Sequence, residues 1–446
     1  MIRPAEEDVL KKKGIRTTLD FLNERIYAGQ KIGMVNLGCA RNLVDSQTIL
    51  GKLKKDGHAI VDMDRADVAI VNTCAFIEDA KKESIDAILD LIELKKQGKI
   101  KRVVVAGCLA QRYGKELAAE IDGIDAILGV QKLDRQAVPD SVSLTPKHFA
   151  YVKICESCYN RCSFCAIPGI KGKFVSRTIE SVLTEVKRLD EAGAQEINII
   201  GQDITAYGMD IYREKSLARL LKEIIPVTKN IQWVRLLYAF PAHVTDELID
   251  VMAREEKICK YIDMPLQHIS DPLLSSMNRG ITTQGTRDLI RKLRRQMPQG
   301  ILRTTFIVGL PGETDRDFNE LMDFVREERF ERVGVFVYSR EEGTPAFDMP
   351  GQVPDRVKRS RMDELMREQQ KIAQDLHQKF VGRTLRVLIE EKQKGDGRVF
   401  FGRSEYDAPD VDGVVYVHAP RDLSPGDFVT ARITDAYEYD LVGETA

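Results

Sequence analysis

The sequence predicts an α/β protein made of three consecutive folding units. Two stretches of the chain alternate short β-rich runs with amphipathic helical patterns, which is typical of parallel sheets. A third stretch has short strands separated by Gly, Pro and Asp turns, which favours a small antiparallel β-barrel. We therefore expect an N-terminal extension over 1–30, a parallel-sheet βαβ domain over 31–135, a partial (β/α) barrel over 145–375 and an OB-like β-barrel over 380–446.

The overall composition is typical of a cytoplasmic globular protein. The chain has 446 residues, a formal net charge of −2 and 43% hydrophobic residues. Eight cysteines are too few for a secreted disulfide scaffold, and their clustering indicates metal or redox chemistry in a reducing compartment. The N-terminus is too charged for a signal peptide, and no apolar run approaches the roughly 20 residues of a membrane span. The extension contains one short helical pattern, TTLDFLNERI (17–26), to which we assign no function.

Three β-rich runs in the first unit each end in a cysteine. KIGMVNLGC, ADVAIVNTC and RVVVAGC end at Cys39, Cys74 and Cys108, and IDAILG (124–129) follows as a fourth strand. Parallel strands end at one edge of a sheet, and open α/β sheets bind their ligands at that edge. We therefore expect the three thiols to share a metal site, although a single cysteine at a strand end is usually a small core residue.

The second unit contains six predicted strand–helix repeats. After a linker near 131–149, the expected strands are AYVKI, EINIIGQD, WVRLLYAF, YIDMPLQH, RTTFIVGL and VGVFVYS. A complete barrel has eight repeats, so this one should be incomplete, with its active face at the C-terminal ends of the strands. A long helical stretch over 355–380 then leads into the terminal barrel.

Four cysteines crowd the stretch CESCYNRCSFC (155–165), directly after the first barrel strand. Zinc binding would pair Cys155 with Cys158 and Cys162 with Cys165, but the pairs are much closer together than in zinc ribbons and fingers. The better grouping is Cys158, Cys162 and Cys165, whose thiolates would hold three irons of a cubane and leave the fourth iron open. Four buried thiols without a shared role are the remaining alternative.

The C-x-x-x-C-x-aromatic-C spacing resembles the signature of radical S-adenosylmethionine enzymes. LGCARNLVDS, NTCAF, AGC, CSFCAIP, MPLQH, MNRG, RTTFIVGLPGET and YSREEGTPA also resemble the methylthiotransferase family, over nearly the whole chain from Lys31. The resemblance implies a radical-SAM barrel, a TRAM-like terminal barrel, two [4Fe-4S] clusters, and S-adenosyl-L-methionine as the source of both the radical and the methyl group. The implied ligands are Cys158, Cys162 and Cys165 for the cluster that reduces S-adenosylmethionine, and Cys39, Cys74 and Cys108 for the auxiliary cluster that handles the inserted sulfur.

Two positions near the cysteine cluster depart from the family pattern. The family usually has a small residue at the position of Cys155 and Gly at the position of Ser157. We expect Cys155 to be a packed thiol, with replacement of a cluster ligand as the alternative. Cys259, in the helical-looking stretch KICKYIDM, is expected to be a core thiol.

Further candidate residues follow the barrel strands. Phe164, Gln202 and Asp203 are predicted to bind the cofactor, although a structural cap is an equally simple role for the latter two. GLPGET (309–314) would let the backbone approach the cofactor, or form a strand-to-helix turn with Thr314 as the helix N-cap. No catalytic acid, base or nucleophile is predicted, and a core position is the simpler role for the lone His268.

The clusters do not distinguish a tRNA substrate from a protein substrate. Residues 380–446 contain 8 Lys and Arg against 13 Asp and Glu, whereas an RNA-binding barrel should present a basic face. We therefore expect the acidic stretch SEYDAPDVDG to dock a basic protein, with a solvated acidic loop as the alternative. GQDITAYG and GRSEYDAPDVDGVVYV resemble the RimO branch of the family, whose members methylthiolate the β-carbon of an aspartate in small-subunit ribosomal protein twelve.

This resemblance leads to the remaining expectations. The partners would be ribosomal protein twelve and a reducing electron donor such as flavodoxin or ferredoxin, and the enzyme would act as a cytoplasmic monomer away from membranes. A tRNA (adenosine) methylthiotransferase is the rival of the same class. A non-catalytic iron–sulfur scaffold or redox sensor is the rival of a different class.

Overall fold

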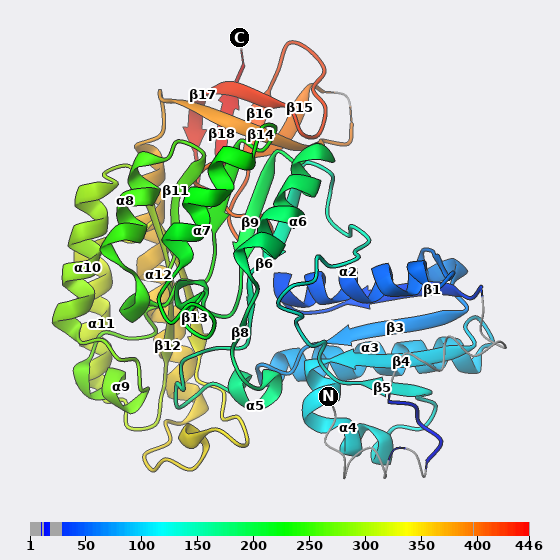
Figure 1. Cartoon of the computed structure of the whole chain (residues 1–446). Coiled ribbons are helices and arrows are strands. Elements are labelled where there is room, and N and C mark those ends of the chain that lie inside the picture. Colours follow the sequence, from blue (N-terminus) through cyan, green and yellow to red (C-terminus); the bar gives the residue numbers. More distant parts are fainter. Residues whose placement is uncertain (1–9, 11–12, 18–28, 396, 446) are drawn as a thin grey trace.

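The structure is a computed structural model that describes residues 10, 13–17, 29–395 and 397–445. It contains two parallel sheets and a closed β-barrel, which confirms the predicted α/β fold class (Figure 1). The helix expected within 17–26 lies outside the described residues except for Thr17. None of the described helices is both long enough and apolar enough to cross a membrane.

The first sheet has five parallel strands in the order β2-β1-β3-β4-β5. The run VAIVNT is buried along its whole length, as expected for a parallel strand covered on both faces. β1, β3 and β4 are neighbours, so the residues that follow them meet at one edge. The elements are β1 (Lys31–Asn36), α2 (Ala40–Lys55), β2 (Ala59–Ile60), η3 (Met63–Arg65), β3 (Val68–Thr73), α3 (Glu78–Lys96), β4 (Arg102–Gly107), α4 (Cys108–Glu120) and β5 (Ala126–Leu128).

The described part of the N-terminal extension packs against this sheet. Leu10 and Ile15 are buried in the sheet's core. Arg16 forms an isolated parallel bridge with Ala126 at the free edge of β5. The extension therefore adds to the edge strand, which protects backbone groups that would otherwise be unpaired.

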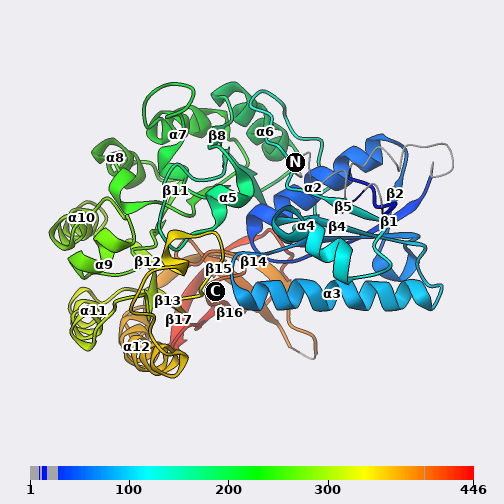
Figure 2. The same ribbon diagram turned by 90° about the horizontal axis from the view of Figure 1, so that it is seen from below.

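The second sheet has six parallel strands in the order β13-β12-β11-β10-β9-β6, as predicted for an incomplete barrel. Its strands are β6 (Phe149–Lys153), β9 (Glu196–Ile200), β10 (Trp233–Leu236), β11 (Ile258–Asp263), β12 (Ile301–Val308) and β13 (Arg332–Val337). The outer helices are α6 (Ile179–Glu191), α7 (Leu217–Ile224), α8 (Asp246–Arg254), α9 (Asp271–Ser276), α10 (Thr283–Gln296), α11 (Asp315–Glu328) and α12 (Asp355–Gln378). α2 of the first unit packs beside β6 (Figure 1), and α12 packs beside β13 (Figure 2).

Short elements shape the loops of this second unit. The loop after β6 contains α5 (Ile167–Lys171) and the small antiparallel pair β7 (Cys155–Glu156) and β8 (Val175–Ser176). Single turns of 3-10 helix follow several strands, namely η4 (Ile204–Ala206), η6 (Pro241–His243) and η7 (Pro345–Phe347), and η5 (Ile225–Val227) directly follows α7. Cys259 lies in strand β11 rather than in the helix that its neighbours suggested, and it is buried in the core.

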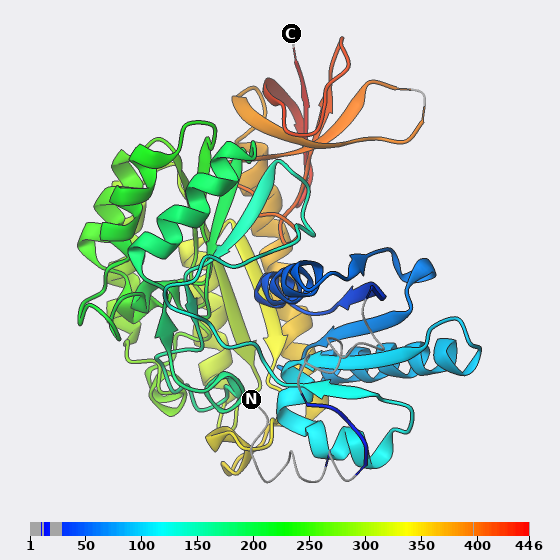
Figure 3. The ribbon, with the colours of Figure 1, turned by 45° about the vertical axis from the view of Figure 1, so that its right-hand side comes forward.

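The C-terminal barrel is closed in the order β14-β15-β16-β18-β17. Its strands are β14 (Thr384–Lys392), β15 (Val399–Ser404), β16 (Val415–His418), β17 (Phe428–Ala436) and β18 (Leu441–Glu444). The β16–β18 pair is parallel and the other pairs are antiparallel. The barrel covers one end of the six-stranded sheet, and α5 lies toward the other end (Figures 1 and 3).

The acidic stretch of the C-terminal barrel lies in this internal interface, and the expected docking surface is wrong. Asp407 accepts a hydrogen bond from Arg332 at 2.6 Å, and Asp412 accepts one from Arg303 at 2.6 Å. Asp410 is exposed but accepts from the Tyr151 hydroxyl at 3.0 Å. Asp407 and Asp412 thus neutralise cations of the partial barrel and are not free to attract a basic protein.

Candidate functional site

Three loops of the first sheet bring Cys39, Cys74 and Cys108 to one edge. Cys39 precedes α2, Cys74 directly follows β3, and Cys108 begins α4. Gly38 has a φ of +83°, and a Cβ there would lie 2.9 Å from Cβ of Cys74. Glycine is therefore needed for the backbone to pass this close to the second cysteine.

A buried amide, Asn42, connects the three loops. Its Nδ2 donates to the carbonyls of Leu37 and Thr73, each at 3.0 Å. The Cys108 thiol lies 3.9 Å from its Oδ1. Sequence reasoning missed Asn42, although it sits three residues after the first cysteine in LGCARNLVDS. Its contacts fix the loops relative to one another before any metal binds.

The three thiols differ in their electrostatic surroundings. Burial acts to raise the pKa of Cys39, but the Arg41 cation beside it outweighs burial and leaves that pKa below its usual value. Burial raises the pKa of Cys74, and it raises the pKa of Cys108 to about 12. Two of the thiols are therefore neutral until a metal takes them as thiolates.

The second group of cysteines lies in the loop after β6. Asn160 Nδ2 lies 3.6 Å from the Cys158 thiol, and Arg279 Nη1 lies 3.4 Å from the Cys162 thiol. Burial raises the pKa of Cys158 to about 11 and that of Cys165 to about 12. Phe164 packs against a small apolar cluster that includes Met277, Leu310 and Tyr338. Asn160 and Arg279 were not predicted as site residues.

The donor set suits clusters better than a single ion. All eight cysteines are free thiols. Within the described part of the chain, no three Cys, His, Asp or Glu side chains converge closely enough to hold one metal ion. A cubane is larger than an ion and is held by more widely separated thiolates. Each triad combines two half-buried thiols with one buried thiol, none of them in a disulfide, and therefore fits three ligands of a [4Fe-4S] cluster.

Cys155 lies apart from both triads. Its side chain is fully buried in the barrel core, and its thiol lies 3.5 Å from the Asp203 carbonyl. A Cβ at Gly201 would lie 2.3 Å from this sulfur. Next to it, Ser157 has a φ of +67° and donates from its hydroxyl to the Gly172 carbonyl at 2.6 Å. The left-handed backbone explains why glycine suits this position in related sequences.

Arg41 lies between the two triads. Its Nε donates to the Cys39 thiol at 3.3 Å, and its Nη1 donates to the Gly201 carbonyl, at the end of β9, at 3.2 Å. Its cation also lowers the pKa of Cys165 against the larger effect of burial. The guanidinium lies 4.3 Å from the centroid of the Tyr238 ring. Arg41 thus contacts both the triad of Cys39, Cys74 and Cys108 and the partial barrel.

A buried charge network holds the two units together beside the triads. Lys153 and Lys171 both bind Asp45 of α2 and Glu156 of β7; Lys171 contacts Asp45 at 2.9 Å and Glu156 at 3.3 Å. The charges balance as two cations and two carboxylates. Gln202 joins this network by donating from Nε2 to Glu156 at 2.7 Å.

Asp203 is saturated with hydrogen bonds. Its Oδ1 accepts from Thr205 and Ala206, as the cap of η4. Its Oδ2 accepts from Asn160 and contacts His243 Nδ1, each at 2.8 Å. The structural cap is therefore present, and Asp203 also orients His243 and Asn160, the latter beside Cys158.

The remaining candidates have structural roles. Thr314 caps α11 in a capping box with Asp317. Gly309 has a φ of +76°, and a Cβ there would lie 2.2 Å from Cγ of Lys358. His268 is fully buried, and its Nδ1 accepts from the backbone N–H of Ser270 at 3.1 Å.

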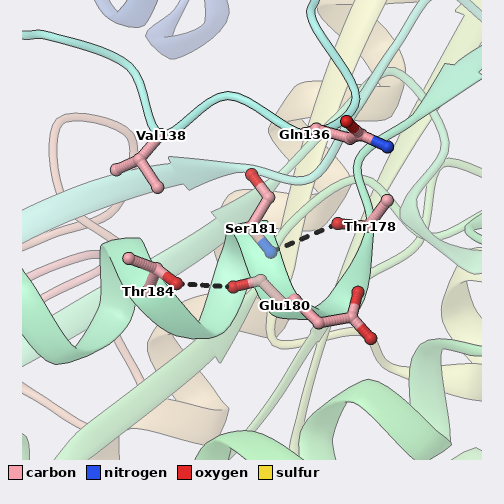
Figure 4. A pocket seen from close by; sticks show the side chains of 6 residues that line it. All are labelled: Gln136, Val138, Thr178, Glu180, Ser181 and Thr184. Carbon is pink, nitrogen blue, oxygen red and sulfur yellow. Dashed lines mark hydrogen bonds between the residues drawn. The ribbon is translucent and has the colours of Figure 1, made fainter.

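A shallow hollow of about 350 Å³ lies where the linker meets the start of α6 (Figure 4). It is lined by Gln136, Val138, Thr178, Glu180, Ser181 and Thr184. The Ser181 N–H donates to Oγ1 of Thr178, and the Thr184 hydroxyl donates to the Glu180 carbonyl (Figure 4). The hollow includes neither cysteine triad, and these polar groups are already paired.

Three segments of the chain match known families. Residues 31–129 match Uncharacterized protein family UPF0004, residues 152–325 match the Radical SAM superfamily, and residues 381–445 match the TRAM domain. Among solved structures, the radical S-adenosylmethionine methyltransferase TsrM from Kitasatospora setae aligns with a TM-score of 0.52 and 15% identity, over 71% of this chain and 74% of that one. This likeness concerns the fold alone.

Curated relatives match almost the entire chain. The ribosomal protein uS12 methylthiotransferase RimO of Desulforamulus reducens is 47% identical over 93% of this chain and 99% of its own length. Proteins of the same name from Syntrophotalea carbinolica and Geobacter sulfurreducens are 46% and 45% identical, over 93% and 94% of this chain and 96% and 99% of their own lengths.

Proposed function

Because this chain belongs to the RimO family of ribosomal protein uS12 methylthiotransferases, we propose that it inserts a methylthio group at the β-carbon of an aspartate in uS12. It is a radical S-adenosylmethionine enzyme with iron–sulfur clusters, as its family requires. When bound, the clusters and S-adenosyl-L-methionine supply one-electron reduction, hydrogen abstraction, and donation of sulfur and a methyl group. The protein's part is to hold these groups and the substrate in the right geometry.

The observation that carries this proposal is the pairing of two cysteine triads. Each triad lies at the C-terminal ends of parallel strands, where α/β sheets and barrels bind their ligands. Arg41 contacts Cys39 on one side and the end of β9 on the other, which supports two clusters serving one reaction. A redox sensor needs no second triad so close to the first.

We assign the ligands as the sequence suggested. Cys158, Cys162 and Cys165 hold the cluster that reduces S-adenosylmethionine, and Cys39, Cys74 and Cys108 hold the auxiliary cluster. We further propose that Phe164 and Gln202 contact the cofactor at the first of these sites. Asp203 acts through Asn160 and His243, because both of its oxygens are already engaged.

Each of the three units has its own part in the proposed reaction. Residues 31–135 carry the auxiliary cluster, 145–375 carry the radical chemistry, and 380–446 close the opposite end of the partial barrel. The protein acts as a cytoplasmic monomer, since the substrate is a ribosomal protein and each triad is supplied by one chain. Its electron donor is a small reductant protein such as flavodoxin or ferredoxin, because S-adenosylmethionine cleavage consumes one electron.

Mass spectrometry of uS12 from cells with and without this gene tests the proposed function. We expect a methylthio mass increment on one aspartate only when the gene is present. An unmodified uS12 in both strains would contradict the proposal, and methylthioadenosine in tRNA digests would then identify the tRNA-modifying alternative.

A further inference from the structure

The proposed reaction takes place at a carbon next to a carboxylate, and the site must hold that carboxylate. A substrate carboxylate that loses part of its hydration on binding is best held by a cation whose own charge is not already neutralised. The cations near the triads can be compared on this basis. Lys153 and Lys171 are both neutralised by Asp45 and Glu156. Arg41 forms no ion pair with a carboxylate within 4 Å among the described residues, and Glu156 acts on its charge only from a longer distance.

On the basis of the proposed function, we propose that Arg41 binds the side-chain carboxylate of the substrate aspartate and so places its β-carbon between the two triads. This is a specificity role, because the guanidinium recognises the charge and planar shape of a carboxylate.

The contacts of Arg41 leave one edge of its guanidinium available. Nε donates to Cys39 at 3.3 Å and Nη1 to the Gly201 carbonyl at 3.2 Å, which fixes the group between the two units. Nη2 has no hydrogen-bond partner among the residues that the structure describes. Arg41 is half-buried as a residue, so it is not sealed inside the core.

Tyr238 holds the guanidinium plane in place. Its ring centroid lies 4.3 Å from the Arg41 carbon Cζ. Its backbone has a φ of +72°, a left-handed conformation that tyrosine rarely adopts, and its N–H donates to Asp263 at 3.3 Å. Strained backbone of this kind persists where the surroundings impose it, and it often marks a functional site.

Another arginine near the triads, Arg279, is less suitable. Arg279 is 4% exposed, and it donates to Cys162 at 3.4 Å and to the Pro265 carbonyl at 2.5 Å. Its guanidinium also stacks over Phe240 at 4.1 Å. Arg279 also has no ion-pair partner among the described residues, but it is more deeply buried than Arg41 and is already bound to Cys162.

The test compares the affinity of the anaerobically reconstituted enzyme for two forms of uS12. One form has its target aspartate, and the other has asparagine at that position. The unaltered enzyme should bind the aspartate form at least about tenfold more tightly than the asparagine form, because the asparagine form loses a charge-assisted hydrogen bond. Arg41→Gln should bind both forms equally, and Arg41→Lys should recover part of the preference.

Arg65→Gln is the matched control, because it removes one exposed cation from the same unit. It should keep the full preference for aspartate. An Arg41→Gln enzyme that still prefers aspartate would overturn the inference, and so would one that loses iron, since Arg41 would then serve the thiolates. If the unaltered enzyme does not methylthiolate uS12 at all, the proposed function itself fails; if it does, only the role of Arg41 is in question.

Discussion

Burial sets the chemistry of single side chains around the two triads. The pKa values of Cys108, Cys158 and Cys165 are raised to about 12, 11 and 12 by desolvation. Neutral thiols cost little to bury, and they become ligands only when iron displaces their protons. Polar neighbours such as Asn42 and Asn160 orient these thiols without neutralising them. The apoprotein can therefore fold around its empty ligand sets.

Replacing each triad by alanine should remove one cluster at a time. The triple variant of Cys158, Cys162 and Cys165 should lose about half of the reconstituted iron and all S-adenosylmethionine cleavage, because three thiolates hold each cluster. The triple variant of Cys39, Cys74 and Cys108 should also lose about half of the iron. Iron analysis and anaerobic cleavage assays measure both effects.

Single alanine variants of Cys155 and Cys259 are the controls for this experiment. Both thiols are buried in the core outside the triads, so both variants should keep the iron. Loss of iron from the Cys155 variant would instead indicate that Cys155 is a cluster ligand.

His268 should make the fold sensitive to mild acid. Burial lowers the pKa of His268 to about 4, while the unfolded side chain titrates near 6.5. Between these values the unfolded chain binds more protons, so the stabilising effect of the neutral ring is present above pH 6.5 and is lost as the pH falls toward 4. Between pH 7 and 5, the free energy of unfolding measured in urea should fall by roughly 2 kcal/mol more in the unaltered protein than in His268→Asn.

Burial lowers the pKa of His377 to about 4 as well, so the His268 variant should retain part of the acid sensitivity. Identical pH profiles for the two proteins would contradict the assignment to His268.

At the scale of elements, α2 and α5 are held together by charge rather than by apolar packing alone. Asp45 extends from α2 to Lys171 at the end of α5 and to Lys153 at the end of β6. Glu156 completes the network, and its pKa is lowered because Lys153 and Lys171 outweigh the larger single effect of burial. The network fixes the auxiliary triad relative to the barrel.

Asp45→Asn should destabilise the protein by about 3–5 kcal/mol, because it leaves two buried ammonium groups with one carboxylate. Chemical denaturation of the apoprotein measures the effect. The exposed pair of Lys55 and Asp140 provides the control, since Asp140→Asn should cost less than about 1 kcal/mol. Equal effects at the two sites would show that the network does not hold the units together.

At the scale of the whole molecule, the C-terminal barrel is part of the same folded body as the partial barrel. Trp233 and Tyr261 pack in one apolar cluster with Val387 and Phe400 of the terminal barrel. Arg403 of β15 donates to Glu196 of β9 at 2.7 Å, and both side chains are fully buried. Asp407 and Asp412 of this barrel face inward for the same reason, because they neutralise the strand cations Arg332 and Arg303.

The two barrels should therefore unfold in one transition. Arg403→Gln leaves Glu196 less neutralised in the interface, so hydrogen exchange should become faster in β14–β18 than in β9–β12, and calorimetry should show two transitions. Lys392→Gln, which breaks an exposed pair with Asp422, should leave a single transition. A single transition in Arg403→Gln would mean that apolar packing alone couples the barrels.

Much of the site could be predicted from the sequence because its cysteines directly follow recognisable strands. The three runs that end in Cys39, Cys74 and Cys108 are short and apolar, so their parallel pairing and common edge followed from pattern alone. Arg41 and Asn42 lie within the same motif, but nothing local indicates which partners they reach. The short stretch around Cys259 was misassigned because an apolar run of that length suits a strand or a helix equally well.

The sequence by itself determined the fold class, the six repeats of the partial barrel and the two cysteine triads, since periodicity and ligand spacing are local properties of the chain. Only the tertiary structure decided which charges are free. In the acidic stretch that suggested a basic partner, Asp412 and Asp407 are paired with Arg303 and Arg332, while Arg41 between the triads forms no ion pair with a carboxylate among the described residues. The net charge of a segment can be counted from its sequence. Whether a given charged side chain is free to bind a partner depends on residues far away in the sequence, which only folding brings next to it.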